Sequence, residues 1–333
     1  MNILVTGGTG FLGKALARRL IKAGHRVTII GRNVVVGQQL TNEGIFFSQG
    51  DLSDQPFIEK ACANQEYVFH CGALSSPWGK YEDFYRTNVT GTKNIISGCK
   101  KAGVKRLIYV STPSIYFHFD DRLDVKESDP LPSRFVNSYA ETKYLAEREV
   151  DQSFQEGLPV ITIRPRALFG PEDTTIIPRL ILANEKRFVP FINGGRVMMD
   201  ITYIENVVDA LLLCMTSHEG TLGKKYNITN GERILFKDVL ETLFHKLEQP
   251  LQKKEISYRK AMGIATAMEW LSKTILFGKE PVLTKYSVSV LAKNQTLNID
   301  AAKTDLGYKP AISINEGMDR FVEWWNLSQN RRD

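Results

Sequence analysis

The chain has 333 residues, with 43 Lys and Arg against 37 Asp and Glu, and 43% of its residues are hydrophobic. This composition is ordinary for a globular protein, and the length suits one large α/β unit plus a smaller lobe. The formal net charge of +6 is spread along the chain without a long basic run. We therefore expect no nucleic-acid partner and only a mild preference for anionic ligands.

The cysteines and the N-terminal sequence indicate the compartment. Four cysteines are scattered without C-x-x-C spacing, which favours reduced structural thiols over disulfides or a metal site. The sequence begins directly with its first predicted strand, and no apolar run reaches the roughly 20 residues of a membrane span. These features predict a cytoplasmic protein without a metal centre.

The first 24 residues combine a strand, a glycine-rich turn and a helix. Residues 3–5 form an apolar β-branched run, typical of a strand buried on both faces of a parallel sheet. The turn TGGTG follows at residues 6–10, and apolar residues recur at helical spacing from Phe11 onward. This order predicts a dinucleotide-binding site, although a glycine turn of another α/β protein remains the alternative.

Each glycine of the turn has an expected role. Gly7 and Gly8 are expected to adopt backbone angles that a Cβ would forbid. Gly10 lets the backbone approach a pyrophosphate, and Gly13 lets the helix pack closely on the strand. The free N–H groups and the dipole at the helix start favour an anion.

The second and third strands bear on the cofactor. The strand at residues 26–30 ends near Arg32, where a carboxylate would select NAD by binding its ribose hydroxyl. A guanidinium suits a 2′-phosphate instead, so NADP(H) is favoured over NAD(H), with a surface arginine as the alternative. Asp51 follows the strand at residues 44–49, within reach of an adenine amino group, or caps the next helix.

Three further strands are predicted at residues 66–70, 104–110 and 160–164. With the helix at 81–102 they complete a Rossmann-type doubly wound parallel sheet. Small residues near Ala73 follow the strand at 66–70, where we expect the cofactor to lie against the chain. The hydroxyls of Ser111 and Thr112 follow a strand at the edge where such sheets carry chemistry.

A helix at residues 139–155 begins with Tyr139 and Lys143, which lie side by side because they are four residues apart. A cation beside the phenol is expected to lower the pKa of Tyr139 toward neutrality, as a general acid–base requires. A chance pair on an exposed helix is the alternative.

Beyond Gly170 the alternation of strand and helix loosens. Elements are expected at residues 198–204, 205–215, 225–228 and 236–247. We divide the chain into a nucleotide-binding domain at 1–169 and a smaller, mostly helical substrate lobe at 170–333, interleaved with the sheet. The stretch 261–277 carries an apolar stripe, favouring core or pocket lining over peripheral membrane contact.

Taken together, the motifs resemble the extended short-chain dehydrogenase/reductase family over nearly the whole chain. The resemblance rests on these segments: TGGTGFLG at 6–13, Asp51-Leu52, NVTGT at 88–92, Ser111-Thr112, YAETK at 139–143, Arg164-Pro165 and Gly170-Pro171. Within that family, the chain is most similar to the branch of 3β-hydroxysteroid dehydrogenases and 2-alkyl-3-ketoalkanoate reductases. Phe117 and Glu172 depart from the usual pattern in expected substrate loops.

The resemblance implies roles for particular residues. Tyr139 would be the general acid–base, Lys143 would assist it and hold the nicotinamide ribose, and Thr112, or Ser111 beside it, would bind the substrate oxygen. Asn88 would organise a water or backbone group near the lysine. The implied cofactor-binding residues are Gly7, Gly10, Phe11, Leu12, Arg32, Asp51, Leu52, Ala73, Tyr139, Lys143, Pro165 and Leu168.

These inferences predict an NAD(P)-dependent oxidoreductase that interconverts a secondary alcohol and a ketone on a steroid-like or lipid-like small molecule, for example a 3-keto acid. The alternatives are a nucleotide-sugar epimerase or dehydratase that retains NAD, and a non-catalytic regulator that binds NADP. Resemblance to the family also implies a homodimer formed through the helices near 81–102 and 139–155.

Overall fold

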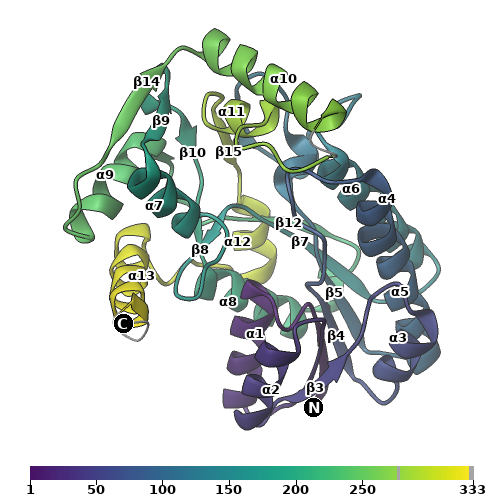
Figure 1. The fold of residues 1–333 in the computed structure, drawn as a ribbon. Coiled ribbons are helices and arrows are strands. Elements are labelled where there is room, and N and C mark those ends of the chain that lie inside the picture. The colour runs from purple at the N-terminus through teal and green to yellow at the C-terminus, as the bar shows by residue number, and fades with distance from the viewer. Residues whose placement is uncertain (276–277, 330–333) are drawn as a thin grey trace.

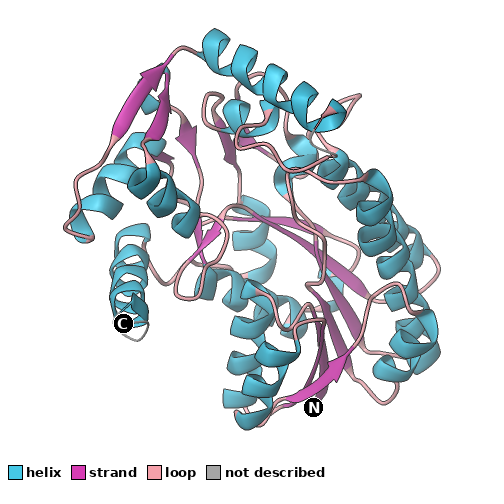
Figure 2. Cartoon of the chain, viewed as in Figure 1, coloured by secondary structure: helices cyan, strands magenta, loops and turns pink. Residues whose placement is uncertain are grey.

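The computed structural model describes residues 1–275 and 278–329. Within them, seven strands form one parallel sheet in the order β12-β7-β5-β4-β1-β2-β3 (Figures 1 and 2). In chain order, its strands are β1 (Asn2–Thr6), β2 (Arg26–Gly31), β3 (Phe46–Gln49), β4 (Tyr67–His70), β5 (Arg106–Val110), β7 (Val160–Pro165) and β12 (Lys225–Ile228). The Rossmann-type sheet predicted from the sequence is confirmed, with strand ends within about two residues of those expected.

Helices cover both faces of this sheet (Figure 1). One face packs on α1 (Phe11–Lys22), α2 (Val34–Asn42), α8 (Ile204–Thr216) and α12 (Asp300–Leu306). The other packs on α3 (Gln55–Cys62), α5 (Gly91–Ala102) and α6 (Ser138–Gln155). Because both faces are buried at the centre of the sheet, β1 is a continuous apolar run without alternation, and Ile3, Leu4 and Val5 have no exposed surface.

The helix predicted at residues 81–102 contains an irregularity. It begins as α4 (Tyr81–Phe84), passes through a π-helical segment, η1 (Tyr85–Thr90), and continues as α5. The π segment contains the buried Asn88. Such segments occur often at functional sites.

The chain beyond β7 builds a second lobe and also returns to the main sheet. The lobe's helices are α7 (Ile177–Lys186), α9 (Phe236–Lys246), α10 (Tyr258–Thr274), α11 (Lys285–Val290) and α13 (Ile314–Gln329), with the short turn η3 (Asn193–Gly195). A further short turn, η4 (Glu219–Thr221), joins α8 to β12 of the main sheet. Its short strands are β8 (Leu168–Phe169), β9 (Val189–Ile192), β10 (Met198–Met199), β11 (Thr202–Tyr203), β13 (Ile234–Leu235), β14 (Lys253–Ile256) and β15 (Gln295–Leu297). The strand expected at 198–204 is therefore two short strands, β10 and β11.

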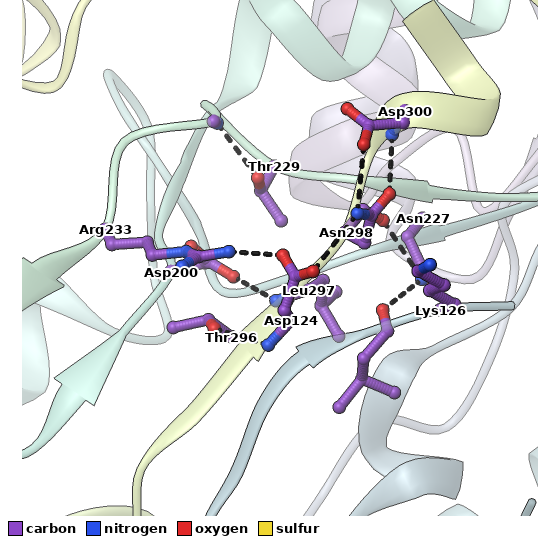
Figure 3. Close-up of polar contacts among 12 residues, drawn as sticks. Asp124, Lys126, Asp200, Asn227, Thr229, Arg233, Thr296, Leu297, Asn298 and Asp300 are labelled. Atoms are coloured by element: carbon purple, nitrogen blue, oxygen red, sulfur yellow. Dashed lines mark hydrogen bonds and ion pairs between the residues drawn. The ribbon is translucent and has the colours of Figure 1, made fainter. Parts of the chain in front are cut away.

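A polar network attaches the lobe to the main sheet near β15 (Figure 3). Strand β6 (Arg122–Val125) pairs with β15, and Asp124 bonds there to Arg233 and Asn298. The buried Asp200 accepts a hydrogen bond from the Leu297 backbone N–H at 2.7 Å. The Asn227 carboxamide, on β12 of the main sheet, donates to the Val125 and Asn298 carbonyl oxygens at 3.0 and 3.3 Å and so links this network to the sheet.

The prediction that the apolar stripe at residues 261–277 lines the core or a pocket is wrong in part. In α10 the buried residues are Ala261, Ala265 and Ser272, whereas Ile264 and Leu271 are exposed. The side chains that fit the inner face are the small ones, so the large apolar ones point outward. Leu276 and Phe277, at the end of this stretch, lie outside the described residues.

Candidate active site

The glycine turn between β1 and α1 forms the floor of the site. Gly7 has φ +66°, and a Cβ there would lie 2.7 Å from the Cα of Gly72. A Cβ on Gly13 would lie 2.3 Å from the Gly7 carbonyl oxygen, so the helix packs directly on the turn, as predicted. Gly8 does not need a left-handed backbone, contrary to expectation; its Cβ would instead collide with Ile29 at 2.3 Å.

A cavity of about 650 Å³ opens above this turn at the carboxyl ends of the strands. It gathers residues from widely separated segments, because the carboxyl ends of parallel strands share one edge. Every residue that the sequence suggested for cofactor binding lines it: Gly7, Gly10, Phe11, Leu12, Arg32, Asp51, Leu52, Ala73, Tyr139, Lys143, Pro165 and Leu168. Ser111 and Thr112 line it too, whereas Asn88 does not.

Arg32 and Asp51 lie at the outer end of this cavity. The Arg32 side chain is 67% exposed and stands 4.0 Å from an Asp51 carboxylate oxygen. Asp51 accepts hydrogen bonds from the Ser53 backbone N–H at 2.9 Å and hydroxyl at 2.7 Å, and the backbone bond holds the pKa of Asp51 below its usual value. Asp54, not Asp51, caps α3 through the Phe57 N–H. Arg32 is therefore available to an anion, while Asp51 is already partly engaged.

Tyr139 and Thr112 meet at the inner end. Thr112 caps the short helix η2 (Pro113–Tyr116) and donates to the Ser114 hydroxyl at 3.1 Å. Burial raises the pKa of Tyr139 to about 12, and the nearby Thr112 hydroxyl opposes that rise. Both side chains line the inner end of the cavity.

Lys143 differs from the sequence-based expectation. Its ammonium donates to the Val110 carbonyl oxygen at 2.7 Å and lies 4.3 Å from the centre of the Tyr109 ring. Burial lowers the pKa of Lys143 to about 7, with Glu147 opposing. The expected lowering of the Tyr139 pKa toward neutrality is wrong for this structure, because desolvation of the phenol dominates.

Asn88 acts behind the cavity wall. Its carboxamide oxygen accepts the Leu74 N–H at 2.7 Å, and its amide donates to the Leu74 carbonyl at 3.2 Å and the Thr142 hydroxyl at 3.1 Å. It therefore ties the loop after β4 to the residue beside Lys143. The expected link to backbone near the lysine is present, made through Leu74 and Thr142.

A buried ion pair supports the same wall and was missed from the sequence. Glu147 pairs with Arg164, whose Nε lies 3.1 Å away, and both side chains are nearly inaccessible. Ser111 donates to the same carboxylate at 2.6 Å. Ser111 is thus engaged with Glu147, whereas Thr112 lines the cavity without a bond to this ion pair. The position of Glu147, four residues after Lys143 on one helix face, was the available signal.

A second cavity of about 910 Å³ adjoins the first. The two meet where Ser114, which lines the first, is hydrogen-bonded at 3.3 Å to Tyr286, which lines the second. Many of the second cavity's side chains are aromatic or apolar: Trp78, Phe84, Phe117, Phe119, Phe135, Tyr258, Met262 and Tyr286. Arg134, Lys273 and Lys285 also line it, and Glu269 lies 3.5 Å from the Lys285 ammonium.

A glycine turn under a cavity at the carboxyl ends of the strands, with Tyr, Lys and Thr in its lining, defines a nucleotide-binding enzyme of the Rossmann class. The chain belongs to the NAD dependent epimerase/dehydratase family, whose family model matches residues 3–229. This membership confirms the predicted extended short-chain dehydrogenase/reductase resemblance.

Two relatives match nearly the whole chain. The 2-alkyl-3-oxoalkanoate reductase of Stenotrophomonas maltophilia is 34% identical over 325 residues, covering 96% of this chain and 98% of the relative. The decarboxylating sterol-4-alpha-carboxylate 3-dehydrogenase of Mus musculus is 32% identical, covering 96% of this chain and 89% of the relative. Both lie in the branch that the motifs indicated.

The fold also matches solved structures. The UDP-glucuronic acid 4-epimerase of Bacillus cereus, solved with NAD, superposes with a TM-score of 0.79 at 21% identity, covering 98% of this chain and 99% of the epimerase. At this identity, the likeness concerns the fold alone. Across residues 1–275 and 278–329, no helix combines the length and apolar character needed to cross a membrane.

Proposed function

We propose that this protein is an NAD(P)-dependent oxidoreductase that interconverts a secondary alcohol and a ketone on a lipid-like small molecule. The observation that carries the proposal is that Tyr139, Lys143 and Thr112 line one cavity, which begins at the glycine turn. A phenol and a hydroxyl together can bind one substrate oxygen, donating a proton to it and stabilising its charge.

The cavity suits a nicotinamide dinucleotide. A Cβ at Gly7 or Gly13 would fill the turn that a pyrophosphate must approach, and both positions lack one. Gly10 and Phe11 open α1, where free N–H groups would bind the pyrophosphate, and Pro165 and Leu168 would line the nicotinamide. Bound there, the nicotinamide supplies or accepts the hydride.

The chain's own residues move the proton. Tyr139 donates it to the substrate oxygen during reduction and accepts it during oxidation, and Thr112 holds that oxygen beside the phenol. Lys143, whose pKa of about 7 allows both protonation states near neutrality, assists by binding ribose hydroxyls and supplying positive charge near the phenol.

The second cavity supports a lipid-like substrate. Its aromatic lining provides a large apolar surface, and it adjoins the reacting groups at Ser114 and Tyr286. The relatives' names, 2-alkyl-3-oxoalkanoate reductase and sterol-4-alpha-carboxylate 3-dehydrogenase, agree with a hydrophobic hydroxy or keto acid.

Replacement of Tyr139 tests the chemistry. In Tyr139→Phe we expect kcat for ketone reduction to fall by about 10²–10⁴-fold, because the proton donor is lost. NADPH binding, measured by fluorescence titration, should change little. Full turnover in this variant would contradict the proposal.

The preference for NADP(H) is a second part of the proposal, and Arg32 supports it. The guanidinium is largely exposed at the end of β2, where a 2′-phosphate would lie. Arg32→Ala should raise the Kd for NADPH about 10-fold and leave the Kd for NADH unchanged. Arg148→Ala, another exposed arginine, serves as the control. Equal weakening of both cofactors would refute the preference.

The alternative is a nucleotide-sugar epimerase, favoured by the NAD-bound 4-epimerase among the solved structures of this fold. Such an enzyme would copurify with NAD and epimerise a UDP-sugar without consuming added NADPH. Chromatography of the nucleotide released from the denatured protein distinguishes the two functions, because only the epimerase is expected to copurify with NAD.

We also propose a homodimer formed through α4, α5 and α6, as the family resemblance implied. Tyr81 and Tyr85 of this surface are partly exposed, with ring centres 6.0 Å apart. Sedimentation equilibrium should give twice the chain mass, and Tyr81→Glu together with Tyr85→Glu should lower it to the monomer mass.

A further inference from the structure

Glu172 is a charged residue near the first cavity that the proposed chemistry does not use. It lies in the turn between β8 and α7, at one of the positions where the sequence departs from the family pattern. Its backbone has φ +68°, a left-handed conformation that favours glycine. A residue with a side chain holds such a conformation only where its surroundings fix it.

The Glu172 carboxylate bonds to two cations on α1. Oε2 accepts a hydrogen bond from the Lys14 ammonium at 2.6 Å, and Oε1 accepts one from Arg18 Nη1, also at 2.6 Å. Lys14 and Arg18 are four residues apart and therefore lie on one face of the helix. The Lys14 side chain is 16% exposed and that of Glu172 is 33% exposed. Because each carboxylate oxygen has its own half-buried partner, the contact is stronger than an isolated surface pair.

The residues that follow Glu172 form one hydrogen-bonded turn. Asp173 is buried, and its carboxylate accepts the backbone N–H groups of Thr175 at 2.7 Å and of Ile177 at 2.9 Å. It also accepts the Thr175 hydroxyl at 2.9 Å. The bonds of Glu172 to α1 therefore fix the position of the whole turn.

This turn and the start of α1 line the same cavity. Residues 174–176 line the first cavity together with Gly10 and Phe11. Lys14 donates its backbone N–H to the Gly10 carbonyl oxygen at 3.0 Å, so its side chain leaves the first turn of α1, where the free N–H groups would bind a pyrophosphate. The ion pair of Lys14 with Glu172 thus joins two parts of the cavity lining that are 158 residues apart in the sequence.

We propose that Glu172 is a positioning residue that fastens residues 170–176 to α1 and so retains the dinucleotide cofactor in the first cavity. The inference rests on the cofactor part of the proposed function. A dinucleotide in this cavity would contact both the glycine turn and residues 174–176, since both line it. Its release then requires the bonds of Glu172 to break. The pyrophosphate is common to NADPH and NADH, so Glu172 slows the release of both.

Cofactor release measured by stopped flow tests the proposal. Bound NADPH or NADH is displaced by an excess of its oxidised form, and the loss of fluorescence gives the dissociation rate constant. In Glu172→Gln we expect this constant to rise about 10-fold for both cofactors, since two charge-assisted bonds are lost. Arg32→Ala, in contrast, should affect NADPH alone. An unchanged rate constant in folded Glu172→Gln overturns the assignment.

Two further variants separate cofactor retention from stability. Glu43 pairs with the same Arg18, 2.7 Å from its Nε, but follows α2 and does not line the first cavity, so Glu43→Gln should release cofactor at the wild-type rate. Glu172→Gly removes the two bonds and also the left-handed strain. It should release cofactor as fast as Glu172→Gln and melt at the same temperature or higher. Fast release in Glu43→Gln, or wild-type release in Glu172→Gly, would refute the role of Glu172.

Hydrogen exchange separates this proposal from the enzymatic one, because it needs no ketone. NADPH should slow exchange at the amides of residues 174–177 in the wild type, and less so in Glu172→Gln. This result in a protein that reduces no ketone would retain the role of Glu172 and reject the oxidoreductase. Ketone reduction with equal release from wild type and Glu172→Gln would do the opposite. A protein that binds neither NADPH nor NADH would reject both.

Discussion

At the scale of single residues, Glu147 connects the largest number of groups at the site. Its carboxylate pairs with Arg164, accepts from Ser111, and raises the pKa of Lys143 against the effect of burial. Arg164 also stacks on the Tyr116 ring, 4.9 Å from its centre. One carboxylate therefore positions the strand ends on which the reacting hydroxyls stand.

Removal of Glu147 should be strongly destabilising. Glu147→Ala leaves Arg164 buried and uncompensated, so we expect the free energy of unfolding to fall by about 3–5 kcal/mol. Glu149→Ala on the same helix removes an exposed pair with Lys93 and should cost less than about 1 kcal/mol. Urea denaturation compares them, and similar losses in the two variants would contradict this account.

Asp200 makes stability depend on pH. Burial raises its pKa from 3.8 to about 6, so the folded state favours the protonated carboxyl (Figure 3). The stabilising contribution is present below pH 3.8 and is lost as pH rises through about 6. Asp200→Asn, which keeps an acceptor for the Leu297 N–H, should therefore stabilise the protein at pH 8 by about 1–3 kcal/mol.

That gain should disappear well below pH 3.8, for example at about pH 2.5, where Asp200 is protonated in both the folded and unfolded states. Thermal unfolding followed at both pH values measures the difference. A gain of the same size at both would mean that charge at Asp200 plays no part.

The sequence predicted which residues lie at the candidate site better than it predicted the contacts around them. Short sequence motifs contain Tyr139, Lys143 and Thr112. These motifs can be recognised from their residue spacing without the tertiary structure. The pairing of Glu147 with Arg164 and the bond of Arg166 to Gln295 are contacts between residues 17 or more positions apart. No periodic pattern predicts such contacts, which is also why the Tyr139 pKa was expected in the wrong direction.

At the scale of elements, the π-helical segment η1 explains how Asn88 reaches the loop after β4. The extra residue per turn changes the direction of the side chain, so a buried amide meets both polar groups of Leu74. In Asn88→Ala the Leu74 N–H and carbonyl lose their partners. We expect a loss of about 1–3 kcal/mol in stability and a lower kcat, since the cavity wall loosens.

Stopped-flow turnover and thermal unfolding together check this prediction. Ser97→Ala in α5, which removes only a hydrogen bond to Glu59, is the control. If kcat is unaltered in Asn88→Ala, Asn88 contributes to the stability of the fold and not to turnover.

Long, strongly periodic elements were predictable, and short ones were not. Strands β1 and β2 and helices α1 and α6 follow the expected ranges because their apolar runs are continuous or amphipathic. The two-residue strands of the lobe, such as β10 and β13, are too short to carry a period and form through tertiary contacts. The π segment was missed because its residues also suit an ordinary helix.

At the scale of the whole molecule, the two parts of the chain cannot be separated without opening the main sheet. Strand β12, at residues 225–228, pairs with β7 along the edge of the sheet. Helices α8 and α12 complete the apolar core on one face. The sequence analysis expected a strand at 225–228 and a lobe interleaved with the sheet, but the pairing of that strand with β7 is seen only in the tertiary structure.

A fragment of residues 1–169 should therefore not fold cooperatively. It would expose the unpaired edge of β7 and the apolar surface that α8 covers, so we expect aggregation and no sharp thermal transition. Circular dichroism and light scattering compare it with the full chain. A soluble fragment that melts cooperatively would show that β12, α8 and α12 are dispensable.

The late arrival of β12 has a consequence for biosynthesis. At roughly 5–20 residues per second, a ribosome needs about 3–13 s to progress from the end of β7 to the end of β12. During that interval the nascent chain presents an open hydrogen-bonding edge, which invites pairing with neighbouring chains. Yield in cells should therefore depend on chaperone capacity and on translation speed across residues 165–228.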